Sequence, residues 1–206
     1  MSLELSLDDG RFLVQLARRT ITEYLNLRKV PNTPRDVPSK LLQKWGVFVT
    51  INTFIEGAEE LRGCIGFPLP ELPLVEATIS AAVSAATRDP RFPPLTKKEL
   101  QNIVVEVSVL TPPELISVRE AKEYPNAIKI GRDGLIVEQG YFKGLLLPQV
   151  PVEWHWDSEE FLCNCCLKAG LPPDAWLLPG CKVYRFQAII FKEKFPCGPV
   201  EQVVLS

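Results

Sequence analysis

The sequence lacks the features that would direct a chain to a membrane or to nucleic acid. No positively charged start leads into an apolar signal segment, and no apolar run approaches the length of a membrane span. The formal net charge is −2 and the pI is about 5.6, so the chain has no general attraction for phosphate backbones or acidic membranes. We predict a cytoplasmic protein without a membrane partner, and nucleic acid is disfavoured as a ligand.

Several motifs that identify common chemistries are also missing. The sequence contains no GxGxxG, P-loop, HExxH or GxSxG pattern and no RNA-stacking signature of an RRM. Histidine occurs once, as His155 between two tryptophans, and a Cys–His dyad would have to use it. We expect His155 to have a structural role, because adjacent aromatic residues suggest packing. No cofactor is evident.

Six cysteines are present, and a cytosolic chain favours free thiols over a disulfide framework, although the cytosols of thermophiles do tolerate disulfides. Cys163 and Cys166 have CxxC spacing, with Cys165 between them and with Cys181 and Cys197 further on. The spacing falls inside a predicted helix, and the later cysteines form no second close pair. We therefore predict no metal site.

Hydrophobic periodicity predicts alternating helices and strands along the chain. Asp8 or Asp9 is expected to cap the first helix, and Asp157 the last one in a capping box with Glu160. The segment from Pro31 to Pro38 is expected to form an extended loop, and residues 56–60 a hairpin tip. A further helix is predicted at 74–88. Strands are predicted at 45–52, 61–65, 103–110, 127–130, 135–138, 142–147 and 183–191.

Short turns between the predicted strands imply antiparallel pairs. We therefore predict an α+β fold, with a largely antiparallel β-sheet and helices packed on one side of it. At 206 residues the chain has room for one sizeable core or for two intimate lobes that share a core. No linker or internal repeat divides it, so residues 1–206 are predicted to form a single domain.

The most distinctive stretch is the hexapeptide LRGCIG at residues 61–66. Gly63 and Gly66 permit close backbone approach, so a turn here can present amide N–H groups and the Cys64 sulfur to a ligand. Arg62 beside them would favour an anion or a thiolate. The alternative is that Cys64 is a small buried residue on a strand, with glycines where neighbouring backbone requires them.

Two other polar segments are candidates for the same site. Asp89 and Arg91 follow the helix predicted at 74–88, and they either face the hexapeptide or pair with each other in a helix-terminating loop. Gln149 and Glu153 lie in a proline-rich segment that we expect to leave a strand in an extended conformation, from which they reach a ligand or tie the loop to the backbone. Glu106 interrupts an apolar strand and is expected on its solvent face.

These segments resemble the AMMECR domain family, which occurs from archaea to animals. The resemblance rests on LRGCIG, on DPRF at 89–92, on VEVSVL at 105–110, and on LPQVP at 147–151 followed by Trp156 and Asp157. It spans nearly the whole chain and implies one AMMECR-type domain without an established reaction. It also implies an association with Memo-type and radical-SAM proteins, which are sometimes encoded together with such chains or fused to them.

Two functions stay open on these residues. The first is a non-catalytic binding or accessory component of a modification pathway, with a cleft around the hexapeptide. The second is an enzyme or acceptor-thiol subunit that uses Cys64 on an anionic substrate. We favour the first, because no complete acid–base set is visible; RNA binding is a third alternative that the acidic pI disfavours. The candidate ligand-binding residues are Arg62, Gly63, Gly66, Asp89, Arg91, Gln149 and Glu153.

Overall fold

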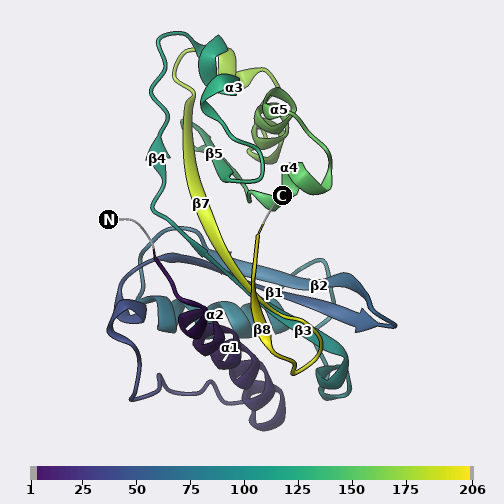
Figure 1. Ribbon diagram of the computed structural model, residues 1–206. Helices are drawn as coiled ribbons and strands as arrows, with labels where there is room; N and C mark the ends of the chain where they lie inside the picture. The colour runs from purple at the N-terminus through teal and green to yellow at the C-terminus, as the bar shows by residue number, and fades with distance from the viewer. Residues whose placement is uncertain (1–3, 205–206) are drawn as a thin grey trace. The chain divides into compact units, whose positions relative to one another are not determined.

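The computed structural model describes residues 4–204 and divides them into two compact units (Figure 1). The first unit contains the described residues up to Leu110 together with Ile189–Val203, and the second contains Thr111–Ala188 and Val204. The chain passes from the second unit into the first within one strand, β7 (Lys182–Glu193). Each unit has its own hydrophobic core.

The first unit is built on an antiparallel sheet in the order β2-β1-β3. A fourth strand, β8 (Val200–Val203), pairs with the end of β7. This sheet confirms the strands that were predicted at 45–52, 61–65 and 103–110. The strands are β1 (Gly46–Ile55), β2 (Ala58–Phe67) and β3 (Ile103–Leu110).

Two residues connect β1 to β2, which makes the hairpin tighter than the tip predicted at 56–60. Glu56 and Gly57 have φ values of 53° and 86°. Positive φ at both central positions is the requirement of a type I′ turn, whose twist matches that of the flanking strands. β2 therefore begins at Ala58 and carries the hexapeptide in its second half.

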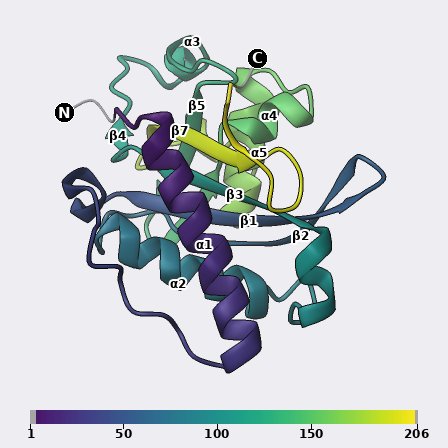
Figure 2. The same ribbon diagram turned by 60° about the horizontal axis from the view of Figure 1, so that its bottom comes forward.

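Two long helices, α1 (Leu7–Leu27) and α2 (Leu74–Thr87), lie on the same side of β1, β2 and β3 (Figure 1) and contact each other (Figure 2). The alternate β1 residues Val49 and Ile51 point into the core beneath these helices. The N-cap of α1 is Ser6, so the predicted caps Asp8 and Asp9 were wrong. Asp9 occupies the third helical position and completes a capping box with Ser6. Short 3₁₀ turns occupy Ser39–Leu42 and Lys97–Asn102.

In the second unit, β7 pairs antiparallel with β5 and with the short β4, while β5 also pairs with β6. Helix α5 packs on β5 and β6, and its Phe161 is fully buried. Asp157 caps α5 in a capping box with Glu160, as predicted. The elements are β4 (Glu114–Leu115), α3 (Tyr124–Ala127), β5 (Asp133–Gln139), β6 (Phe142–Leu146), α4 (Gln149–Glu153) and α5 (Ser158–Lys168), with 3₁₀ turns at Ala121–Glu123 and Ala175–Leu177.

Two predictions in this unit were wrong. Residues 127–130 form no strand, because α3 runs to Ala127 and Pro125 favours the start of a helix there. The segment after Leu147 is not extended but forms α4. Pro148 has helical dihedral angles, and Pro151 lies in the first turn, where a missing N–H leaves no helical hydrogen bond unmade.

The fold class is α+β, as predicted, and each strand pair described above is antiparallel. Across residues 4–204, no helix combines the length and the apolarity that crossing a bilayer requires.

Candidate functional site

The hexapeptide lies within strand β2 and not in an exposed turn. The pairing of β2 with β1 contains an irregularity: Cys64 lies opposite Thr50, Gly63 opposite Ile51, and Leu61 opposite Asn52. Arg62 is therefore an extra residue, which makes this position a β-bulge. Because side chains alternate between the two faces of a strand, the bulge decides which face receives Cys64.

Both glycines of the hexapeptide are required by close neighbours. A Cβ atom added to Gly63 would lie 2.3 Å from the backbone oxygen of Ala85 in α2, and one added to Gly66 would lie 2.2 Å from the backbone oxygen of Val47. Real Cβ atoms do not approach backbone oxygens so closely, so these positions exclude larger residues. Gly63 and Gly66 thus follow the alternative interpretation, in which neighbouring backbone demands glycine.

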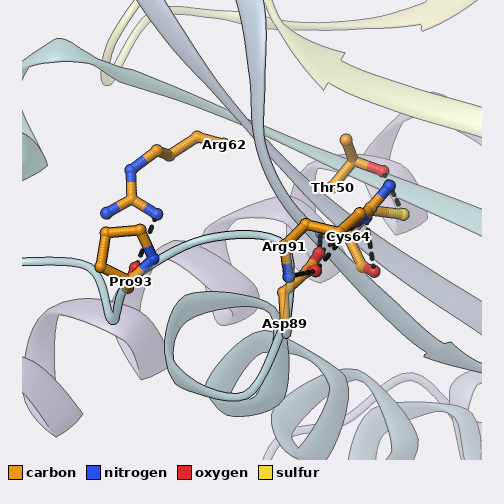
Figure 3. Close-up of polar contacts among 6 residues, drawn as sticks. All are labelled: Thr50, Arg62, Cys64, Asp89, Arg91 and Pro93. Atoms are coloured by element: carbon orange, nitrogen blue, oxygen red, sulfur yellow. Dashed lines mark hydrogen bonds and ion pairs between the residues drawn. The ribbon is translucent and has the colours of Figure 1, made fainter.

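The peptide group of Cys64 is held from the open edge of β2 by the loop that follows α2 (Figure 3). The Cys64 N–H donates to Asp89 Oδ2 at 2.8 Å, and Arg91 Nη2 donates to the Cys64 carbonyl oxygen at 3.5 Å. Arg91 also donates to both Asp89 oxygens, from Nη2 at 2.7 Å and from Nε at 2.9 Å. The two candidates therefore pair with each other and face the hexapeptide at once.

Asp89 is only 4% exposed, yet its negative charge is well compensated. The hydrogen bonds from Arg91 lower the pKa of Asp89 to about 2, and the Cys64 amide adds to this effect against the opposing effect of burial. Arg91 also lies over the ring of Phe92, with 5.5 Å between its guanidinium carbon and the ring centroid. Asp89 is therefore a stable anion that fastens the loop to the strand.

The Cys64 thiol lies on the face of β2 that is turned away from α1 and α2, and the residue is partly exposed. Thr50 Oγ1 donates to Cys64 Sγ at 3.3 Å, and Glu106 lies opposite Thr50 on the next strand. Burial raises the pKa of the Cys64 thiol, while the Thr50 hydrogen bond and the charge of Arg91 oppose the rise. A thiol with a raised pKa is largely protonated at neutral pH and is a weak nucleophile.

Arg62 does not reach the thiol. Its Nε donates to Glu99 Oε1 at 2.7 Å and its Nη1 to the Pro93 carbonyl oxygen at 2.9 Å, and Figure 3 shows the side chain directed toward Pro93 and away from Cys64. Only 13% of the Arg62 side chain is exposed. Its charge is therefore compensated by Glu99, and an anion at Cys64 would have to be held by other groups.

The remaining candidates belong to the second unit. Gln149 and Glu153 lie one turn apart on α4. His155 follows this helix as an exposed residue with a φ of 55°, between Trp154 and Trp156, whose rings stack with centroids 6.1 Å apart. Cys163 and Cys166 lie on α5, and within the described part of the chain no three His, Cys, Asp or Glu side chains are grouped so as to hold a metal ion.

Two residues that contact the hexapeptide were missed in the sequence: Thr50, which donates to Cys64, and Glu99, which pairs with Arg62. Thr50 could have been found only from the register of the hairpin. If Ile55 and Ala58 are paired and the ladder continues regularly, Thr50 falls opposite Gly63, and the bulge at Arg62 moves it opposite Cys64. Glu99 lies within a 3₁₀ turn far along the chain, and its contact with Arg62 has no local signal in the sequence.

Comparison with known proteins gives a consistent result. The AMMECR1 family model matches residues 14–191. A protein of Thermococcus gammatolerans and one of Pyrococcus abyssi are each 60% identical over 194 residues, which is 94% of this chain and 94% of theirs. The crystal structure of an uncharacterised protein from Pyrococcus horikoshii has a TM-score of 0.91 and 58% identity, and the match covers 96% of this chain and 98% of that chain.

Proposed function

The chain belongs to the AMMECR1 family, and on that premise we propose that it is a binding component of a modification pathway that performs no catalysis on its own. The recognition surface in this proposal is the outer face of β1 and β2 around Thr50 and Cys64. The observation that carries the proposal is the environment of Cys64. Its backbone N–H and carbonyl groups are hydrogen-bonded to Asp89 and Arg91, while burial raises the pKa of its thiol.

These contacts suit recognition better than catalysis. The loop fastened by Asp89 covers the edge of β2 and holds Cys64 in one position, so a partner meets a preorganised surface and loses little entropy on binding. A nucleophilic cysteine needs a lowered pKa or an adjacent general base. Among the charged groups around the thiol, Arg91 lowers its pKa, whereas Glu106 and Asp89 raise it through their negative charge.

The proposed partners are Memo-type and radical-SAM proteins, and the proposed compartment is the cytoplasm. The proposed partners follow from the family resemblance. A modification pathway of this kind needs a component that positions another protein or a substrate, and a rigid sheet face is suited to that task.

A second function, in which Cys64 is a nucleophile or acceptor thiol, is favoured by one contact. The hydrogen bond from Thr50 Oγ1 to Cys64 Sγ, like the nearby Arg91 charge, stabilises the thiolate. Both effects are outweighed by burial in the free protein, so this function would require a partner that lowers the pKa of the thiol further.

Calorimetric titration with the Memo-type protein of the same organism tests the first proposal. We expect the Cys64→Ser variant to bind like the unmodified chain, and Thr50→Arg to weaken binding at least about tenfold, because a bulky charge is placed on the proposed surface. Leu27→Arg is the matched control, since Leu27 is 69% exposed at the end of α1. Unchanged binding by a folded Thr50→Arg variant would exclude this surface.

The same variants separate the two functions in a reconstituted pathway. If Cys64→Ser keeps both partner binding and product formation, the chain is a binding component. If Cys64→Ser binds normally but product formation stops, Cys64 takes part in the chemistry and the second function replaces the first.

A further inference from the structure

A second polar cluster lies on α4, and its acceptors find no hydrogen-bond donor within residues 4–204. Gln149 Oε1 is a buried oxygen without a hydrogen-bond partner. Leaving a buried acceptor unpaired costs roughly 1–3 kcal/mol, so native proteins seldom retain one without a reason. Gln149 as a whole remains partly exposed, and its side chain would have to rotate to bring the amide oxygen to a ligand.

Glu153 supplies a second acceptor on the same face of α4. It is four residues after Gln149, and residues at this spacing are neighbours on a helix surface. Among the described residues, the Glu153 carboxylate makes no hydrogen bond or ion pair, and burial raises its pKa. Two acceptors that lack a donor among the described residues therefore lie one helical turn apart on α4.

An exposed aromatic surface adjoins them in the chain. Trp154 directly follows Glu153 and is 66% exposed, and its ring is stacked on that of Trp156 with 20° between the ring planes. The stack holds the indole in place even though most of it faces solvent. The face of an indole is the strongest aromatic partner for an organic cation.

The local charge also favours a cation. The segment 149–160 contains four carboxylates and no lysine or arginine. Asp157 and Glu160 are occupied in capping α5, since both accept backbone N–H groups there. Of the other two, Glu159 belongs to α5, so Glu153 is the carboxylate of α4 that gives the proposed site its negative charge.

We propose that Gln149, Glu153 and Trp154 form a binding site for an organic cation, namely a primary ammonium or a guanidinium group. The amide oxygen and the carboxylate accept its N–H groups, and the indole covers the cation or its alkyl stem. A bare divalent metal ion fits less well, because calcium takes six to eight oxygen ligands. This proposal goes beyond the Cys64 surface and does not depend on it.

Two sources can supply such a group, a free polyamine or a lysine or arginine side chain of a partner protein. NMR titration of the full chain with butylammonium chloride tests the shared chemistry, with butanol as the neutral probe of the same shape. We expect saturable shifts of the Trp154 indole and the Gln149 side-chain amide with the cation only. Parallel titrations with spermidine and with Nα-acetyl-lysine methylamide, whose side-chain ammonium is free, show whether a polyamine or a lysine side chain binds more tightly.

Glu153→Gln removes the charge and keeps the shape, so we expect it to weaken binding of butylammonium about fivefold or more. Glu159→Gln is the matched control: it removes the same charge on the neighbouring helix and should change the affinity less than about twofold. Trp154→Leu is a second test at an exposed position and should also weaken binding. Thermal melts confirm that each variant is folded.

The proposal is overturned if butanol shifts the same resonances as strongly as butylammonium, or if neither spermidine nor any of the other cations gives saturable shifts. It is also overturned if Glu159→Gln weakens binding as much as Glu153→Gln. None of these results bears on partner binding at Thr50 and Cys64, which is measured with a different ligand.

Discussion

The carboxylate beside Cys64 in the first unit and the carboxylate on α4 in the second differ in their hydrogen-bond partners. Asp89 is almost fully buried and has a pKa of about 2, because Arg91 and the Cys64 amide donate to it. Glu153 is more exposed, yet burial raises its pKa, because no donor among residues 4–204 opposes that effect. The two carboxylates show that hydrogen-bond partners, and not burial alone, decide the direction of the shift.

The difference separates a cluster whose charged groups are paired within the protein from one that leaves acceptors unpaired among the described residues. Around Cys64 the protein already supplies a partner for Asp89, Arg91 and Arg62, so a ligand gains little by replacing them. On α4 the protein leaves two acceptors open, and a ligand with N–H groups can satisfy both. The family motif thus contains rigid support at one place and unused hydrogen-bonding capacity at another.

The largest expected loss of stability comes from a substitution beside Cys64. Gly63→Ala should lower the free energy of unfolding by about 3 kcal/mol, because the added methyl group meets the Ala85 backbone, which cannot move without shifting α2. Gly140→Ala is the control: its φ of 60° is strained for alanine, but no atom lies near the new methyl group, so about 1 kcal/mol is expected. Urea unfolding measures both, and equal losses would contradict the close approach.

Asp89→Asn should have the next largest effect, a loss of about 2 kcal/mol in the free energy of unfolding. Asparagine keeps the shape but removes the charge that Arg91 and the Cys64 amide hold. Asp36→Asn, at an exposed position, is the control and should change the stability by less than about 0.5 kcal/mol.

Acid titration of stability sharpens the same prediction. Because the folded pKa of Asp89 lies below its ordinary value of 3.8, its contribution is fully present above that value and is lost as the pH falls through about 2. The difference in stability between the unmodified chain and Asp89→Asn should therefore shrink between pH values of about 4 and 2. A difference that stays constant over this range would show that Asp89 is not held as an anion.

At pH 8, Cys64 should react with iodoacetamide about tenfold more slowly than the exposed Cys197, because burial raises the pKa of the Cys64 thiol. Thr50→Val removes the hydroxyl hydrogen bond and should slow the reaction further. Peptide-resolved mass spectrometry measures each rate. If Cys64 reacted before Cys197, the thiolate would be stabilised in the free chain and the catalytic alternative would gain support.

The smallest change in stability is expected from a substitution on α4. Glu153→Gln should leave the stability at pH 7 unchanged or raise it by about a few tenths of a kcal/mol, since the charge it removes has no partner in the described part of the chain. A raised folded pKa means that the unmodified chain gains stability as the pH falls through that pKa, and the variant should lack this gain. Urea unfolding at pH 7 and 5 measures it, and a clear loss at pH 7 would reveal a partner for Glu153.

Sequence reasoning succeeded where the signal is local and repeated. The periodicity of α1 and α2, the β-branched runs of β1 and β3, and the Asp157 capping box were all predicted. It failed in short segments, where few residues carry the signal. Residues 127–130 suggested a strand and Pro148 suggested an extended loop, yet α3 and α4 are single helical turns that begin beside prolines.

The sequence by itself determined the family, the strand that carries the hexapeptide and the residue types available for chemistry. Only the tertiary structure decided how they are used. The bulge at Arg62 shifts the register by one residue, and with a side-chain period of two this places Cys64 beside Thr50 on the outer face. The contacts of Arg62 with Glu99 and of Asp89 with the Cys64 amide join residues 37 and 25 positions apart, and folding alone brings such distant groups within hydrogen-bond distance.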